Sequence, residues 1–155
     1  MDFSQALDVK VDDIETPPLL PQGTYIWKIT KLPVSETSSS GEWSWVSFNC
    51  VAIAAEEDVD TDELDAYGSL SGAFGQVRFM APTDPEQTTE FNRALDQIKK
   101  FCLNTLRVEV DGDANLSELL NGAVGCEFYA RAVHEIRKND PDITDLRVKG
   151  WAPLD

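Results

Sequence analysis

Positive charges and aromatic rings on extended segments are the side chains of this sequence best suited to binding a ligand. Cations neutralise phosphates, and aromatic faces stack on nucleobases of any kind, for roughly 1–3 kcal/mol per base. Our candidate binding residues lie on or beside predicted strands: Lys28, Lys31, Trp43, Trp45, Arg78, Arg131, Arg147 and Lys149. Strand alternation turns about half of the aromatic residues inward, and we expect Tyr25 to be one of these.

Residues that would support catalysis or hold a metal are sparse. His134 is the only histidine, and the sequence contains no Gly-x-Ser-x-Gly motif. The glycine-rich segment 68–75 lacks the ending of a phosphate-binding loop. A calcium loop starting at Asp58 would need Gly at Glu63 and Glu at Ser69. The cysteines are too few and scattered for a disulfide framework or a zinc site. We therefore expect no enzyme activity, no cofactor and no metal.

The charge of the chain is strongly acidic but unevenly placed. Its 155 residues include 28 acids against 13 Lys and Arg, for a net charge of −15. Such acidity opposes nucleic-acid binding, which is driven by cations that displace counterions. The acids gather in residues 1–22 and 56–65, however, whereas 43–55 is uncharged and 24–34 and 73–82 carry only cations. The sequence therefore predicts a neutral-to-basic sheet surface inside an acidic protein.

Hydrophobic periodicity and turn residues divide the chain into an acidic, proline-rich arm and one domain. The arm covers residues 1–22, the domain covers 23–155, and an acidic loop covers 56–68. Strands are predicted at 24–34, 43–54, 76–80, 123–137 and 143–151, with a further short one at 106–110. Helical spacing predicts one main helix from Asp84 to about Asn104 and one or two turns at 116–121.

The predicted fold is mainly β with one main helix (β/α+β). Five strands with the helix between the third and the fourth follow the chain order of an OB-fold barrel. A five-stranded sheet with a helix packed across one face fits the same pattern. Strict alternation puts Lys28 and Lys31 on opposite faces of their strand, so both reach one groove only if the strand bulges or bends.

Short motifs in the sequence resemble those of a group of phage proteins. They are residues 20–25 with Ile29, Leu95 with Ile98, residues 119–122 with Val124-Gly125, and residues 148–151. With this layout, residues 17–154 resemble phage single-stranded DNA-binding proteins with an OB-type fold. The resemblance implies a viral accessory of DNA replication or recombination that coats displaced single strands. Many single-stranded DNA-binding proteins end in a mobile acidic tail, whereas this sequence ends at Asp155 and has its acids elsewhere.

Four hypotheses follow from these observations. The first is a non-enzymatic, sequence-tolerant single-stranded DNA-binding protein with phage or host replication and recombination proteins as further partners. The second is an acidic DNA mimic that occupies a host DNA-binding enzyme, because a charge of −15 presents a field like that of DNA. A protein-interaction module comes third and an enzyme last.

The sequence gives no sign of a membrane partner. The longest apolar stretch, 51–55, is far short of the roughly 20 residues that span a bilayer, and the first ten residues have no signal-peptide pattern. The expected location is the cytoplasm, which is that of the host cell for a phage protein, with reduced cysteines. Neither composition nor pattern indicates an oligomeric state.

Overall fold

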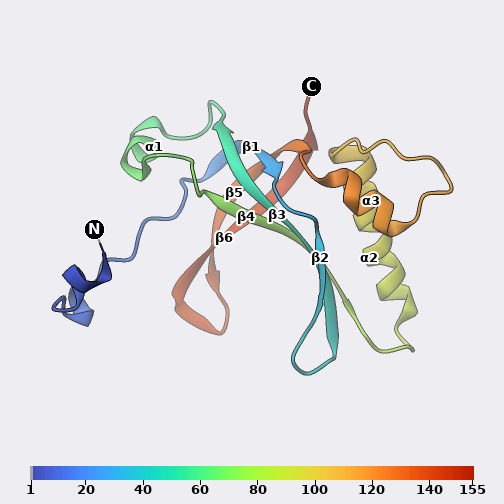
Figure 1. Ribbon diagram of the computed structural model, residues 1–155, viewed down its shortest axis with the longest axis horizontal. Helices are drawn as coiled ribbons and strands as arrows, with labels where there is room; N and C mark the ends of the chain where they lie inside the picture. The colour runs from blue at the N-terminus through green and yellow to red at the C-terminus, as the bar shows by residue number, and fades with distance from the viewer. Residues whose placement is uncertain (1) are drawn as a thin grey trace.

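The computed structural model, described over residues 2–155, is mainly β, with a six-stranded antiparallel sheet and three α-helices (Figure 1). The strands are β1 (Gly23–Ile29), β2 (Val34–Thr37), β3 (Trp43–Ala55), β4 (Phe74–Pro82), β5 (Glu127–Arg137) and β6 (Asp140–Pro153). The helices are α1 (Thr61–Tyr67), α2 (Thr88–Lys100) and α3 (Leu116–Ala123). The expectation of a mainly β protein is confirmed.

The long strand β3 organises the sheet. On one edge it pairs first with β2 and then with β1, and on the other edge it pairs with β4. The order continues from β1 to β5 and β6. Within residues 2–155 no ladder joins β4 to β6, so the sheet is open there. The two ends nevertheless approach one another, because a Cβ placed on Gly75 of β4 would lie 2.6 Å from Val148 Cγ2 of β6.

The prediction of one continuous first strand over 24–34 is wrong. It is divided into β1 and β2 by residues 30–33, and this division gives six strands instead of five. Pro33 in this interval is buried and has no N–H to donate to a ladder, which explains why regular pairing stops. The second of these strands, β2, also extends beyond the predicted end and includes Ser35, Glu36 and Thr37.

A fully buried Trp27 lies at the centre of the core. Its indole Nε1 donates to the carbonyl oxygen of Ala130 on β5 at 3.1 Å, and its ring packs edge-on against Tyr25 with centroids 5.9 Å apart. Tyr25 is likewise fully buried, as predicted, and its hydroxyl donates to the Pro21 carbonyl oxygen at 2.7 Å. Phe48 and Phe128 extend this core across β3 and β5.

The main helix begins later and ends differently than the sequence predicts. Residues 84–87 form a turn in which the Asp84 carboxylate accepts from the Glu86 N–H at 2.9 Å, and α2 begins only at Thr88. Beyond Lys100 the chain continues as a π-helical turn, Phe101–Thr105, which the Leu106 N–H closes by donating to the Phe101 carbonyl oxygen at 2.9 Å. This turn brings Phe101 into the core.

Three other segments depart from the predicted pattern. Residues 106–110 form no strand, because Val108 N–H bonds instead to the Cys102 carbonyl oxygen at 2.9 Å. The expected acidic loop 56–68 contains α1, whose first turn is capped by the Asp60 carboxylate and carries acids that favour a helix N-terminus. The strand expected from 123 begins at Glu127, because α3 runs on to Ala123.

The N-terminal arm projects from the end of the molecule that carries α1 (Figure 1). Residues 2–19 are exposed, and they include short 3-10 turns at Phe3–Ala6 and Val11–Asp13. Burial begins at Leu20, whose carbonyl oxygen lies 2.7 Å from His134 Nε2. The arm is therefore anchored to β5 at its C-terminal end only.

Replacing Gly75 with Ala tests how closely the two ends of the sheet pack. The added methyl group would lie 2.6 Å from Val148 Cγ2 and 2.7 Å from Trp27 Cζ3, both on buried side chains. We expect a loss of about 1–3 kcal/mol in the free energy of unfolding, measured by urea denaturation. Gly112→Ala is the control, since no atom lies within 4 Å of its added methyl group. Equal stability of the two variants would contradict this packing.

Candidate nucleic-acid interface

The ladders place the candidate residues of the strands on one face of the sheet, opposite the core. Alternation puts Trp43 and Trp45 of β3 on the face shared with Arg78 of β4, while Phe48 and Val77 turn inward. Lys28 of β1 pairs with Val51 on this same face. Across β1, the register continues the face through Arg131 to Lys149 and Arg147 on β6. Lys31 is exposed but lies outside the strands, in the 30–33 connection.

Four side chains on β3 and β4 form a compact surface, which we call the platform: Trp43, Trp45, Arg78 and Met80. The Arg78 guanidinium carbon lies over the Trp45 ring, 4.9 Å from its centroid. Trp43 is 46% exposed and Met80 47% exposed. An arginine held over an indole is attracted by the ring and remains able to bind an anion. The platform thus offers charge and an apolar aromatic surface at one place.

Two polar groups at the platform have no hydrogen-bond partner within the described chain. They are the buried Nε1 of Trp45 and the buried Oγ of Ser47. Ser47 pairs directly with Arg78 across the β3–β4 ladder. An unsatisfied buried polar group costs free energy and is uncommon in native proteins. Both atoms are buried beneath the platform and out of reach of a ligand on its surface.

The cations of the β5–β6 hairpin are engaged in ion pairs. Glu135 forms ion pairs with both Lys149 and Arg147, the latter at 3.7 Å. Asp145 lies 2.7 Å from Arg137 and 3.7 Å from Arg147. The hydrogen bond from Arg137 holds the pKa of the Asp145 carboxyl below its usual range. Arg147 and Lys149 are thus exposed but partly neutralised by acids on the same face, unlike Arg78.

Arg131 packs against the backbone of the neighbouring strand. Its Nε would lie only 3.1 Å from a Cβ placed on Gly150, a residue with a φ of +63°. Nearby, the Asp58 carboxylate accepts from the Thr24 N–H and hydroxyl, both at 2.8 Å. These hydrogen bonds lower the pKa of Asp58, and Arg131 contributes to the same shift. Arg131 therefore shares its surroundings with an ionised carboxylate.

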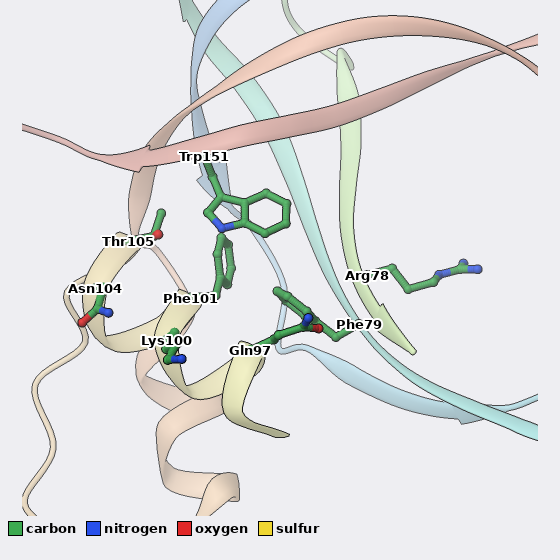
Figure 2. Close-up of a pocket in the computed structure, with 8 residues that line it drawn as sticks. All are labelled: Arg78, Phe79, Gln97, Lys100, Phe101, Asn104, Thr105 and Trp151. Atoms are coloured by element: carbon green, nitrogen blue, oxygen red, sulfur yellow. The ribbon is translucent and has the colours of Figure 1, made fainter. Parts of the chain in front are cut away.

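A cleft of about 430 Å³ opens where β4 and β6 remain unpaired. We call it the seam cleft; its lining residues are Arg78, Phe79, Gln97, Lys100, Phe101, Asn104, Thr105 and Trp151 (Figure 2). Of these only Arg78 was among the candidates. The helical spacing of Gln97, Phe101 and Asn104 indicates that these three residues share one side of a helix. It does not indicate which strand that side faces.

The arrangement offers little for bond-making chemistry. Burial raises the pKa of the Cys50 and Cys102 thiols to about 12, which keeps them protonated and poorly nucleophilic. No group of three or more His, Cys, Asp and Glu side chains suited to a metal occurs within residues 2–155. The Nε2 atom of His134 contacts the Leu20 carbonyl oxygen at 2.7 Å.

No protein-family model and no curated protein sequence matches this chain. Among the described residues, no helix combines the length and the apolar character needed to cross a membrane.

The Asp58 to Thr24 hydrogen bonds predict a pH-dependent contribution to stability. Because the pKa of Asp58 is lower in the folded protein, its contribution is present above the ordinary value of 3.8 and is lost as pH falls through the folded pKa. At this exposed site we expect Asp58→Asn to cost less than about 1 kcal/mol at pH 7. The difference in urea midpoint between the variant and the wild type should be constant near pH 7 and should shrink as the pH falls below 3.8. Glu57→Gln, an exposed neighbour, controls for the change in charge, and a difference that persists at low pH would contradict the assignment.

Proposed function

We propose that the protein is a non-enzymatic single-stranded DNA-binding protein that coats strands with little sequence preference, in phage replication or recombination. The observation that carries this proposal is the stacked pair of Arg78 and Trp45, beside the exposed Trp43. Sequence-tolerant binding of single strands combines cations for phosphates with aromatic faces for bases. The platform supplies both within one face of β3 and β4.

The strand order supports an OB-type fold for this function. If β1 and β2 are taken as one bent first strand, the chain has five strands, with α2 between the third, β4, and the fourth, β5. The helices α1 and α3 are additions in the connections before β4 and before β5. The pairing order is then third, second, first, fourth and fifth strand, with the gap between the third and the fifth. OB-folds bind oligonucleotides across their second and third strands. The platform occupies the corresponding strands, β3 and β4.

Local charge is compatible with this partner despite the net charge of −15. The platform strands contain no acid, since β3 is uncharged and β4 carries only Arg78. Lys28 on β1 adds a cation to this face, opposite Glu127 of β5. One acid, Glu36 of β2, pairs with Trp45, and the exposed acids of the arm lie on a separate segment. Screening over a Debye length of about 8 Å at physiological salt weakens repulsion between distant charges. Binding should therefore be salt-sensitive but not prevented.

The exposed acids of residues 2–15 favour one other function, that of an acidic DNA mimic. A mimic would bind a basic enzyme and leave oligonucleotides unbound, whereas a coating protein binds oligonucleotides directly. A titration of fluorescent oligo-dT of about 30 nucleotides, beside duplex of equal length, separates them. We expect tight binding to the single strand that weakens steeply with salt, and weak binding to duplex. No binding even at low salt would overturn the proposal in favour of the mimic.

Variants at the platform should weaken this binding without unfolding the protein. Trp43→Ala removes an exposed ring and should reduce affinity for oligo-dT by about 5- to 100-fold, as expected for the loss of base stacking. Arg78→Ala should weaken binding and reduce the salt slope by about one unit, because one phosphate contact is lost. Arg93→Ala, an exposed cation on α2, is the matched control. Affinities that are equal across all these proteins would remove the platform from the site.

Glu135 provides a test of the hairpin cations. It pairs with both Arg147 and Lys149, so Glu135→Gln should free Lys149 and remove one of the two acids that neutralise Arg147, which keeps Asp145 at 3.7 Å. We expect a rise in oligo-dT affinity of roughly 2- to 10-fold at low salt, with a steeper salt slope, measured by the same anisotropy titration. Glu118→Gln on α3 makes the same change in net charge elsewhere. If both variants gain equally, the effect comes from net charge, and the hairpin cations lie outside the site.

A further inference from the structure

We propose that the seam cleft binds one nucleobase of the bound strand, with adenine preferred. The inference rests on the proposed single-stranded DNA binding and deepens it, because it adds a base-reading position to an otherwise sequence-tolerant surface. It is carried by three features of the cleft, namely an aromatic wall, two exposed amide side chains and a cation shared with the platform. A volume of about 430 Å³ falls within the range of ligand sites, about 300–1,000 Å³.

The aromatic wall is formed by Trp151 with Phe79 and Phe101. The Trp151 ring centroid lies 5.3 Å from that of Phe101 and 5.8 Å from that of Phe79, both in edge-on arrangements. Phe79 and Phe101 are buried, whereas Trp151 is 37% exposed. In Figure 2, Trp151 from β6 lies over Phe101 of the π-helical turn, with Phe79 of β4 beside them. The tryptophan is thus supported from within the core and still accessible to a stacking partner.

A β-bulge turns Trp151 toward this cleft. Arg131 of β5 pairs with Lys149, but Tyr129 pairs with Ala152, so β6 has one extra residue between these pairs. Gly150, with its φ of +63°, lies in the interval. The extra residue reverses the alternation, and Trp151 therefore leaves the face of Lys149 and joins the aromatic core. Such a bulge re-aims a side chain and is common beside binding sites.

Two amide side chains supply hydrogen-bonding groups to the cleft. Gln97 lies in the last turns of α2, and Asn104 lies in the π-helical turn that follows. Both residues are exposed, so their amide groups are accessible to a ligand. An amide offers an acceptor and a donor side by side, which matches the N7 acceptor and N6 donor of adenine. Thr105 also lines the cleft.

Arg78 connects the cleft to the platform. It belongs to the lining of the cleft, yet its guanidinium lies over Trp45 on the outer face. Figure 2 shows its side chain directed away from the aromatic wall, on the opposite side of β4 from Phe79. A strand that crosses the free edge of β4 can therefore place a phosphate at Arg78 and the adjoining base in the cleft. Lys100, paired with Asp96 at 2.7 Å, lies on the helical side of the cleft.

The double variant Gln97→Ala with Asn104→Ala tests the base-reading role. The dissociation constants for dA30, dC30 and dT30 are measured for the wild type and the variant. For each oligonucleotide, the constant of the variant is divided by that of the wild type. Taking this ratio cancels the intrinsic stacking of each homopolymer. We expect the affinity for dA30 to fall by about 5- to 20-fold and the affinity for dT30 to fall by less than about 2-fold. The salt dependence of binding should be unchanged, because the amides touch no phosphate.

The control variant is Asn92→Ala, which removes an exposed amide of α2 outside the cleft. Urea denaturation confirms that all variants are folded, as expected for exposed helical positions. Equal losses on the three oligonucleotides, or no loss at all, would overturn the base-reading role while leaving the proposed function intact. If the wild type binds none of them, the proposed function itself fails. The two failures are therefore distinguishable.

Discussion

The structure depends on the burial of Trp27 between strands that are distant in the sequence. Its indole N–H bonds to Ala130 on β5, and its ring occupies the space that a side chain at position 75 of β4 would need. Val148 of β6 meets the same point. The side chain of Trp27 on β1 is therefore packed among residues of β4, β5 and β6. The curvature of the sheet follows from this, because a flat sheet could not bring both of its ends to one ring.

That curvature decides which surfaces are available for binding. Wrapping the core inside turns the other face of every strand outward, and the stacked Arg78 and Trp45 lie on that face. The gap between β4 and β6 remains open as a cleft instead of closing with a ladder. The platform and the seam cleft therefore share one cause, and Arg78 belongs to both. The positive charge of cations farther along the face, such as Lys149, is partly neutralised by ion pairs with neighbouring acids.

Much of the strand pattern and the identity of the outward-facing residues could be predicted from the sequence. Period-two alternation is local, so it placed Tyr25 inside and Trp43 with Trp45 on one face. Predictions failed where a local signal was overridden. Pro33 interrupted the single strand predicted for 24–34, and Asp60 capped a helix inside a stretch that repulsion between acids predicted to be a loop. Element ends were displaced for similar reasons.

The sequence by itself determined the outward cations and aromatic rings, the acidic segments and the mainly β architecture, because these depend on spacing of only a few residues. Only the tertiary structure decided which of these groups meet. The contact of Arg78 with Trp45 depends on the register of β3 against β4. The pairing of Lys149 with Glu135 depends on the register of β5 against β6. The seam cleft required a bulge at Gly150 and a π-helical turn, and both are adjustments of the backbone to packing between distant segments, for which no local pattern codes.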